Sequence, residues 1–301
     1  MMIIPSEYVA GEGISDATSR EHVYQVALDG DPLEHIKSLA KFFGVDGQVE
    51  DLNKDGSYGS TQYPVYSVGS QDGTGKSVSV YWSGIGSWNY YDPNAYRDVA
   101  DEDTNLPNAR EARAEATRIF NATGLNVSAS DIRVMVDDYS AQATALLQIA
   151  GQDTAIEWYL SWGRSGEIGS ASGAFAKFID KGEFNTISAK DAVSRILDGR
   201  YSGALASSFW DNARLSIGDT IQSDMLPNPE ANPEVVKVTI EKATKANLLI
   251  WDASGNAWIV PGFALTDERG WIQSVFSLED GVVELADLPE VMPMDDVISN
   301  K

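Results

Sequence analysis

Cysteine is absent from this chain of 301 residues, which excludes disulfides, thiolate catalysis and cysteine-based zinc or iron–sulfur sites. Basic residues are scarce as well, because Lys and Arg number 22 against 45 Asp and Glu, giving a net charge of −23. Such a charge repels phosphate backbones and anionic headgroups. We therefore expect neither a nucleic-acid partner nor direct binding to a membrane surface, whereas a cation or a basic protein patch would be attracted.

Long hydrophobic runs are also missing, since no stretch approaches the ~18 apolar residues of a membrane span. The segment from Met1 to Pro5 is too short and too uncharged to serve as a signal peptide. We expect any export signal or anchor of the full-length protein to lie outside this sequence. The 43% of apolar residues is ample for a folded core.

No motif for catalysis or for cofactor binding stands out, so we predict no catalytic residue, no cofactor and no metal ligand. His22 and His35 have no G-x-S-x-G elbow nearby, and His35 falls inside a predicted helix. The segment from Asp51 to Gly56 copies the start of a calcium loop, but Gln62 stands where that loop needs a bidentate carboxylate. A hairpin turn explains it better.

A second group of carboxylates precedes a predicted helix, where it would complement the positive end of the helix dipole. We favour a solvated acidic loop over a weak cation site. The group consists of Asp98, Asp101, Glu102 and Asp103.

Three amphipathic helices are predicted from their capping residues. The first starts at Asp31 and stops at Gly44, and the second starts at Asn108 with Glu111 completing a capping box. The third starts at Ser188 and is expected to run as far as Leu197. Each has a single apolar face and therefore needs a sheet or another helix to cover it.

Between and after the helices, alternating aromatic and β-branched runs with turn residues at their joints predict antiparallel strands. The order of helix and then strands recurs, which predicts an α+β fold of tandem helix-plus-antiparallel-sheet units, each twisted sheet covered by a helix. In the last unit we expect two separate strands at 235–243 and 245–252. The expected divisions are a first unit with an N-terminal arm (1–104), a second unit (105–184), a third unit (185–288) with a long loop (201–232), and a tail (289–301).

Aromatic residues cluster in two of the predicted sheets and raise the alternatives of a core and an exposed binding face. Strict alternation places Trp88 and Tyr90 on one face and Asn89 and Tyr91 on the other. Large aromatics are mostly buried, so the core is favoured. The candidate binding residues for the exposed alternative are Trp82, Trp88, Tyr90, Tyr91, Trp158 and Trp162.

The third helix start, from Ile187 to Ala192, together with the repeated order of elements, resembles PepSY-like units and the YycH/YycI regulators. A closer likeness is to uncharacterised, membrane-anchored and lipoprotein-like actinobacterial proteins. The segments that resemble this group are Ser6–Val9, Gly11–Ile14, Ser87–Pro93, Leu106–Ala109 and Val260–Asp267. The resemblance implies an extracytoplasmic, membrane-tethered domain that modulates a partner, and it supplies no catalytic residues.

Three functional hypotheses follow from the sequence. The first is a non-enzymatic extracytoplasmic domain that binds an envelope protein. The second is a binder of carbohydrate or cell-wall polymer through exposed aromatics. The third is a hydrolase that depends on carboxylates or a metal, for which no carboxylate spacing singles out a pair.

Overall fold

In the computed structural model, which describes residues 6–54, 63–100, 103–210 and 235–287, the chain forms an α+β structure with three helices among the described residues. They are α1 (Pro32–Phe43), α2 (Ala109–Ala122) and α3 (Ala189–Ser194). The side chains of Asp31, Asn108 and Ser188 cap them as predicted, and Glu111 completes the capping box of α2. The predicted extent of the third helix was wrong. It ends at Ser194, and Leu197 beyond it is 68% exposed.

Eight strands form the larger sheet, in the order β3-β4-β5-β6-β10-β9-β8-β7, with every neighbouring pair antiparallel. The first four are β3 (Glu50–Asp51), β4 (Val65–Gly69), β5 (Ser77–Tyr81) and β6 (Ser87–Tyr91), and the others are β7 (Arg133–Val136), β8 (Ala141–Ile149), β9 (Gln152–Trp162) and β10 (Ile168–Ala174). Each set follows one helix along the chain. The predicted helix-plus-sheet units are thus confirmed, and they meet where β6 pairs with β10.

Both long helices lie on the same face of this sheet. Helix α1 packs on β4 and β5, and α2 packs on β7 and β8. The core between the helices and the sheet is rich in aromatic residues, and Trp88, Trp158 and Phe120 are all at most 1% exposed. Burial of this face supplies the hydrophobic stabilisation of both units at once.

The smaller sheet has six strands, in the order β1-β12-β13-β2-β11, with β14 also beside β13. They are β1 (Ser6–Ala10), β2 (Arg20–Leu28), β11 (Ala176–Asn185), β12 (Val236–Trp251), β13 (Ala257–Asp267) and β14 (Ile272–Phe276). Strand β1 runs parallel to β12 and the other pairs are antiparallel. Helix α3 packs against β1, β13 and β14.

Two strands predicted at 235–243 and 245–252 are one long strand, β12, so that prediction was wrong. Its register shifts between Ile240 and Lys242, and the strand continues through this bulge and the polar stretch from Glu241 to Lys245. Strands β1, β2 and β11 were not expected. The tail at 289–301 and most of the loop at 201–232 lie outside the described residues.

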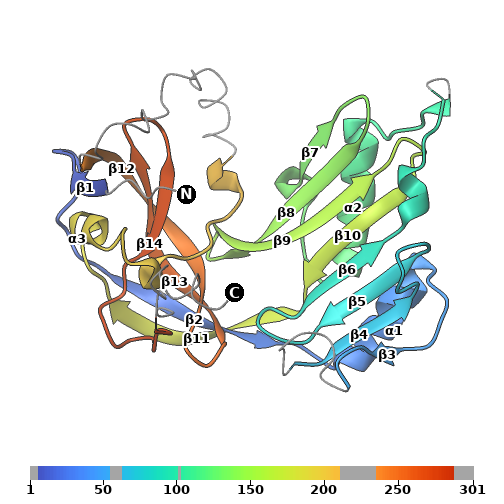
Figure 1. Cartoon of the computed structure of the whole chain (residues 1–301), viewed down its shortest axis with the longest axis horizontal. Coiled ribbons are helices and arrows are strands. Elements are labelled where there is room, and N and C mark those ends of the chain that lie inside the picture. The colour runs from blue at the N-terminus through green and yellow to red at the C-terminus, as the bar shows by residue number, and fades with distance from the viewer. Residues whose placement is uncertain (1–5, 55–62, 101–102, 211–234, 288–301) are drawn as a thin grey trace, which may run out of the picture.

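The chain passes almost directly from one sheet to the other, since only Phe175 separates β10 from β11. Strand β11 then pairs with β2 over most of its length. Figure 1 shows the two sheets as two lobes, with β2 and β11 extending from one toward the other along one side. On the other side, the hydroxyl of Ser207 donates to Glu157 of β9 and accepts from Arg133 of β7, which ties the chain after α3 to the larger sheet.

The proposed divisions at 104/105 and 184/185 remain a prediction. The hydrogen-bonded sheets combine strands across them, because β6 pairs with β10 and β2 pairs with both β11 and β13. No helix in the described parts of the chain is long and apolar enough to cross a membrane.

A glycine at the seam of the two units predicts a large stability effect. Gly173 lies opposite Trp88, and a Cβ at this position would come within 2.4 Å of Nε1 of Trp158. We expect Gly173→Ala to destabilise the protein by about 1–3 kcal/mol, because the buried indole has no room to move. Urea unfolding at constant pH measures this. Gly13→Ala is the control, since a Cβ there meets nothing within 4 Å, and equal midpoints for the two variants would contradict the packing argument.

Candidate functional site

The face of the larger sheet turned away from α1 and α2 presents two rows of small polar and aromatic side chains. Residues directly opposite each other in neighbouring strands share a face, so the pairing registers define the rows. One row consists of Gln142, Ser161, Ser170, Tyr91 and Ser77, and the next consists of Thr144, Tyr159, Ser172, Asn89 and Ser79. We call these ten residues the open face.

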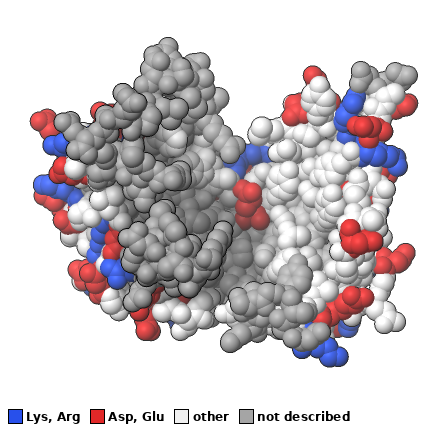
Figure 2. All heavy atoms as spheres, in the orientation of Figure 1, with Lys and Arg blue, Asp and Glu red and all other residues white. Residues whose placement is uncertain are grey.

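The open face contains no charged residue, although the whole chain carries a net charge of −23. If the second row is extended onto the outer strands, charged residues occur only at its two ends, which are Arg133 on β7 and Glu50 on β3. Figure 2 shows this side of the larger lobe as mostly uncharged, with acidic and basic residues at its rim. The acidity of the protein is therefore displayed elsewhere on its surface.

Tyr96 lies on this face, brought there by the short helix η1 (Pro93–Tyr96) that follows β6. Its hydroxyl lies 3.0 Å from the Ser161 hydroxyl and 3.1 Å from that of Ser170. A Cβ at Gly169 would come within 2.3 Å of the Tyr96 ring, so the glycine makes room for it. The ring also stacks on Tyr91 at 6.2 Å between centroids. The two tyrosines form an aromatic ledge that is partly open to solvent.

Tyr159 occupies the centre of the second row beside Ser172. Partial burial is the main cause that raises the pKa of its phenol, so the hydroxyl is neutral at physiological pH. It can both donate and accept a hydrogen bond. The open face therefore offers donors and acceptors without fixed charge.

Four of the six aromatic residues proposed for an exposed binding face are buried in the core instead, which corrects that part of the hypothesis. Trp88, Tyr90, Trp158 and Trp162 point toward the helices and are at most 4% exposed, because they occupy the covered side of the alternating pattern. The indole N–H of Trp162 donates to Glu115 of α2 at 3.0 Å.

The remaining two candidates have different surroundings. Tyr91 belongs to the open face and is 42% exposed. Trp82 is half-buried beside the rings of His35 and Phe175. Sequence reasoning missed Tyr96 and the serines, although the alternation of serine with apolar residues in β5 and β10 was a usable signal.

The two histidines make local contacts. His35 donates from Nε2 to the carbonyl of Asp29 at 2.6 Å and stacks on Phe175 with 3.7 Å between ring centroids. His22 lies on β2, with Nδ1 2.9 Å from Asp180 of β11 and Nε2 3.8 Å from Glu183. Both histidines therefore serve local structure.

A small pocket lies where β2 and β13 separate. Their pairing covers only Trp258 and Ile259 of β13, after which β14 becomes the neighbour. Pro261 lies where the neighbour of β13 changes from β2 to β14. Proline has no N–H, so no backbone donor is left unpaired there. Its carbonyl accepts from the backbone N–H of Ser277 at 2.9 Å. The cavity measures about 150 Å³, which is smaller than a typical ligand site.

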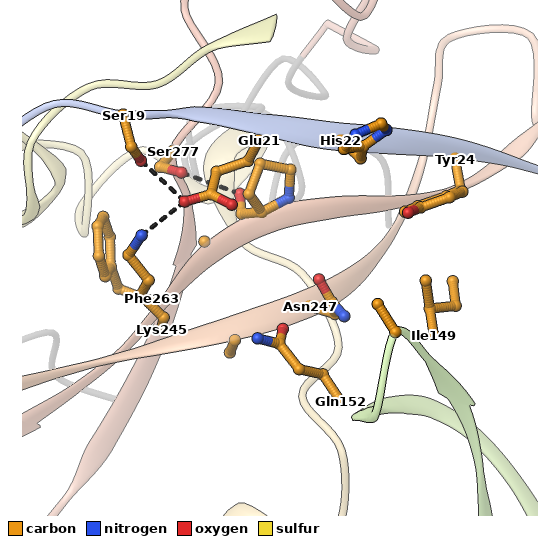
Figure 3. A pocket seen from close by; sticks show the side chains of 14 residues that line it. Ser19, Glu21, His22, Tyr24, Ile149, Gln152, Lys245, Asn247, Phe263 and Ser277 are labelled. Atoms are coloured by element: carbon orange, nitrogen blue, oxygen red, sulfur yellow. Dashed lines mark hydrogen bonds and ion pairs between the residues drawn. The ribbon is translucent and has the colours of Figure 1, made fainter. Parts of the chain in front are cut away.

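The pocket contains one ion pair and two amides, as Figure 3 shows. Glu21 accepts from Lys245 at 2.5 Å and from Ser19 at 2.9 Å. The hydrogen bond from Lys245 is the main cause that lowers the pKa of Glu21. The side chains of Asn247 and Gln152 extend into the same space from β12 and β9. The site suits a single small polar group.

Neither candidate cation site gains support from the described residues. The segments 55–62 and 101–102 lie outside them, so the loop from Asp51 to Gly56 and the acidic group around Asp98 are described only in part. Within its described portion, Asn53 donates to the carbonyl of Tyr63 at 2.7 Å. Among the described residues, no group of three or more His, Asp or Glu is placed to hold a metal ion.

Comparison with known proteins gives distant structural likenesses. No protein-family model matches the sequence, and no curated protein matches it significantly. An uncharacterised protein from Eubacterium rectale ATCC 33656 aligns over 94% of this chain and 90% of its own, with 9% identity and a TM-score of 0.44. The C-terminal domain of YpeB from Bacillus megaterium aligns over 84% of this chain and 100% of its own, with 11% identity and a TM-score of 0.31. At these scores the likenesses are no basis for a function.

The contact between His22 and Asp180 predicts a pH-dependent stability. The hydrogen bond with Asp180 is the main cause that raises the pKa of His22 above its ordinary 6.5. Because the folded-state pKa is the higher one, the stabilisation is fully present below the pKa of the unfolded chain and is lost as the pH rises through that of the folded protein. Urea unfolding between pH 5 and pH 9 should therefore show His22→Gln losing most stability at the acidic end.

The variant Asp180→Asn is the matched control, because it keeps the imidazole and removes its partner. We expect it to lose the same pH-dependent contribution between neutral and mildly acidic pH. Parallel stability curves for the wild type and both variants would contradict the assignment.

Proposed function

We propose that this chain is a non-enzymatic extracytoplasmic domain of a membrane-anchored bacterial protein, and that its open face binds an envelope protein. The observation that carries the proposal is a wide uncharged face on a strongly acidic chain. The extracytoplasmic location and the anchoring rest on the resemblance in sequence to tethered regulators.

The chemistry of the open face supports protein recognition. Serine, tyrosine and asparagine are the residues that antibody binding sites favour, because tyrosine offers a large contact area at a low entropic cost and the small polar residues adapt their hydrogen bonds. Burying hydroxyls that find partners costs less than burying charges. An interface can therefore form here without stripping water from ionised groups.

Rigidity of the support favours the same function. The open face is backed by the buried aromatic core, so its backbone is held by packing from behind. Asn89 and Tyr91 project from β6 at the seam of the two units, in the middle of the sheet. A preorganised surface loses less conformational entropy on binding.

The area of the face sets a requirement on the partner. With strands about 4.8 Å apart and a rise of about 3.3 Å per residue, five strands of five residues cover roughly 400 Å². A standard interface buries about 800 Å² on each side. A partner protein would therefore also contact the rim of the sheet or the neighbouring lobe.

Carbohydrate binding is a second candidate, and the stacked pair of Tyr91 and Tyr96 favours it. Sugar rings pack on aromatic faces, and the Ser170 hydroxyl beside the pair could hydrogen-bond to a sugar hydroxyl. Tyr91→Ala tests this better than substitution of the buried tryptophans, because it leaves the core intact. Glycan-array binding that is abolished by Tyr91→Ala would favour the polysaccharide over the protein partner.

Placing a charge on the open face should abolish partner binding. We expect Asn89→Arg to reduce capture of a chemically cross-linked envelope partner at least about tenfold, because an unpaired guanidinium would be buried in the interface. The measurement is quantitative mass spectrometry of cross-linked envelope fractions with the purified domain.

Ser38→Arg is the matched control for this change. It introduces the same side chain at an exposed position of α1, on the opposite side of the larger sheet. If the two arginine variants captured the same partners equally well, the open face would not be the binding surface.

A further inference from the structure

The outer edge of the larger sheet is an unpaired strand, β7, and its hydrogen-bonding groups point outward in a regular pattern. The backbone N–H of Asp137 donates to the carbonyl of Ser140 at 3.0 Å, which closes the hairpin to β8. Because hydrogen-bonded residues alternate in an antiparallel pair, Met135 and Arg133 also bond toward β8. Val134 and Val136 therefore direct their N–H and C=O groups away from the sheet. No described residue pairs with them there.

Natural sheets protect such edges with lysine, proline, a bulge or a covering element. Strand β7, which is short at four residues, has no lysine, proline or bulge. The carbonyl of Ile132, which points outward by the same alternation, accepts from Arg113 of α2 at 3.4 Å. This contact ends the free part of the edge on one side and leaves the two valines available.

The side chains along this edge are apolar and unusually exposed. Met135 is 71% exposed, Val136 is 43% exposed, and Tyr139 in the following turn is 73% exposed. Met135 lies on the side of the open face, opposite Gln142, while Val136 lies on the side of the helices. An added strand could thus cover apolar surface on both faces of the sheet.

Acidic residues stand at both ends of this apolar edge. Asp131 precedes β7 and has its pKa lowered mainly by the hydroxyl of Ser128, while backbone N–H groups of Tyr139 and Ser140 lower the pKa of Asp137 after it. Asp138 adds a third carboxylate. Three basic residues lie near the edge. Arg133 is turned to Glu157 and Ser207 on the open-face side. Arg113 donates to the carbonyl of Ile132 at one end, and the guanidinium of Arg164 lies 5.9 Å from the ring centroid of Tyr139 at the other.

We propose that the β7 edge binds an extended segment of a partner protein, with an apolar centre that pairs with Val134 and Val136 and with lysine or arginine at both flanks. This is strand addition, in which main-chain hydrogen bonds give affinity and alternate side chains give specificity. It rests on the proposed function and deepens it, since the edge borders the open face and supplies the rim contact that the area requires. The charges of the flanks complement the three carboxylates.

The test uses a fluorescein-labelled peptide of alternating valine and threonine with two lysines at each end, and measures fluorescence anisotropy against the whole chain. We expect saturable binding that weakens at least about tenfold in Val136→Pro, which removes an outward N–H and no internal hydrogen bond. Val136→Thr keeps the N–H and the branched shape, so it should bind as the wild type does. Asp138→Lys should weaken binding by about threefold or more at low salt.

A second peptide guards against two artefacts. The same peptide N-methylated at its central amides keeps its charge but cannot form the strand hydrogen bonds, so it separates strand addition from general attraction to an acidic protein. It also requires no change to the protein, in case the proline variant unfolds. Equal binding of both peptides, or no saturable binding of the unmethylated one, would overturn the proposal.

The two proposals fail separately in this design. Asn89→Arg should leave peptide binding unchanged, because Asn89 lies in the middle of the sheet, away from β7. If the peptide does not bind while partner capture still depends on Asn89, only the strand-addition proposal is lost. If the peptide binds but partner capture is unchanged in both Asn89→Arg and Val136→Pro, the proposed function is contradicted instead.

Discussion

The pairing of β6 with β10 is the contact on which the rest of the larger lobe depends. These two strands close the separate helix-plus-sheet units into one antiparallel sheet, with Asn89 opposite Ser172 near the centre of the seam. Because both helices lie on the same side, most of one face of the sheet is covered by helices and the other face carries no helix among the described residues. With one unit turned over, each face would have been covered by a helix over only one half of the sheet.

The close approach at this seam demands small residues on one strand. Gly173 and Ala171 of β10 are paired with Trp88 and Tyr90 of β6. The small residues leave space that the large buried rings fill. The indole N–H groups of Trp88 and Trp158 have no hydrogen-bond partner among the described residues. Each costs some free energy of folding, which the apolar burial of these large rings offsets. At the seam, the free energy gained by burying the rings is thus larger than the cost of the two missing hydrogen bonds.

Local features of the structure could be predicted from the sequence, and non-local ones could not. The caps at Asp31, Asn108 and Ser188 follow from hydrogen bonds within a few residues, so they were identified correctly. Strand β11 alternates weakly and carries several charges, and its stability comes from pairing with β2, far away in sequence. The local sequence of β11 therefore does not predict that it pairs with β2.

The candidate site shows the same division. Alternation correctly separated Trp88 and Tyr90 from Asn89 and Tyr91, but a period of two does not say which side a helix will cover. That choice depends on where α1 and α2 dock. The polar rows became visible only when registers aligned serines from strands far apart in the chain, such as Ser79 and Ser172 on either side of Asn89.

The junction between the lobes explains how the open face stays accessible. A second sheet carried on the same chain could fold over the first and bury it, as in a sandwich. Here β11 continues from β10 after a single residue and is held to β2, which fixes the direction in which the smaller sheet departs. On the opposite side, the hydroxyls of Ser207 and Ser208 donate to Glu157 in the middle of β9 and to Asp153 near its start. The smaller lobe is thus held to the larger sheet from both sides, and Asn89 and Tyr91 in the middle of that sheet remain exposed.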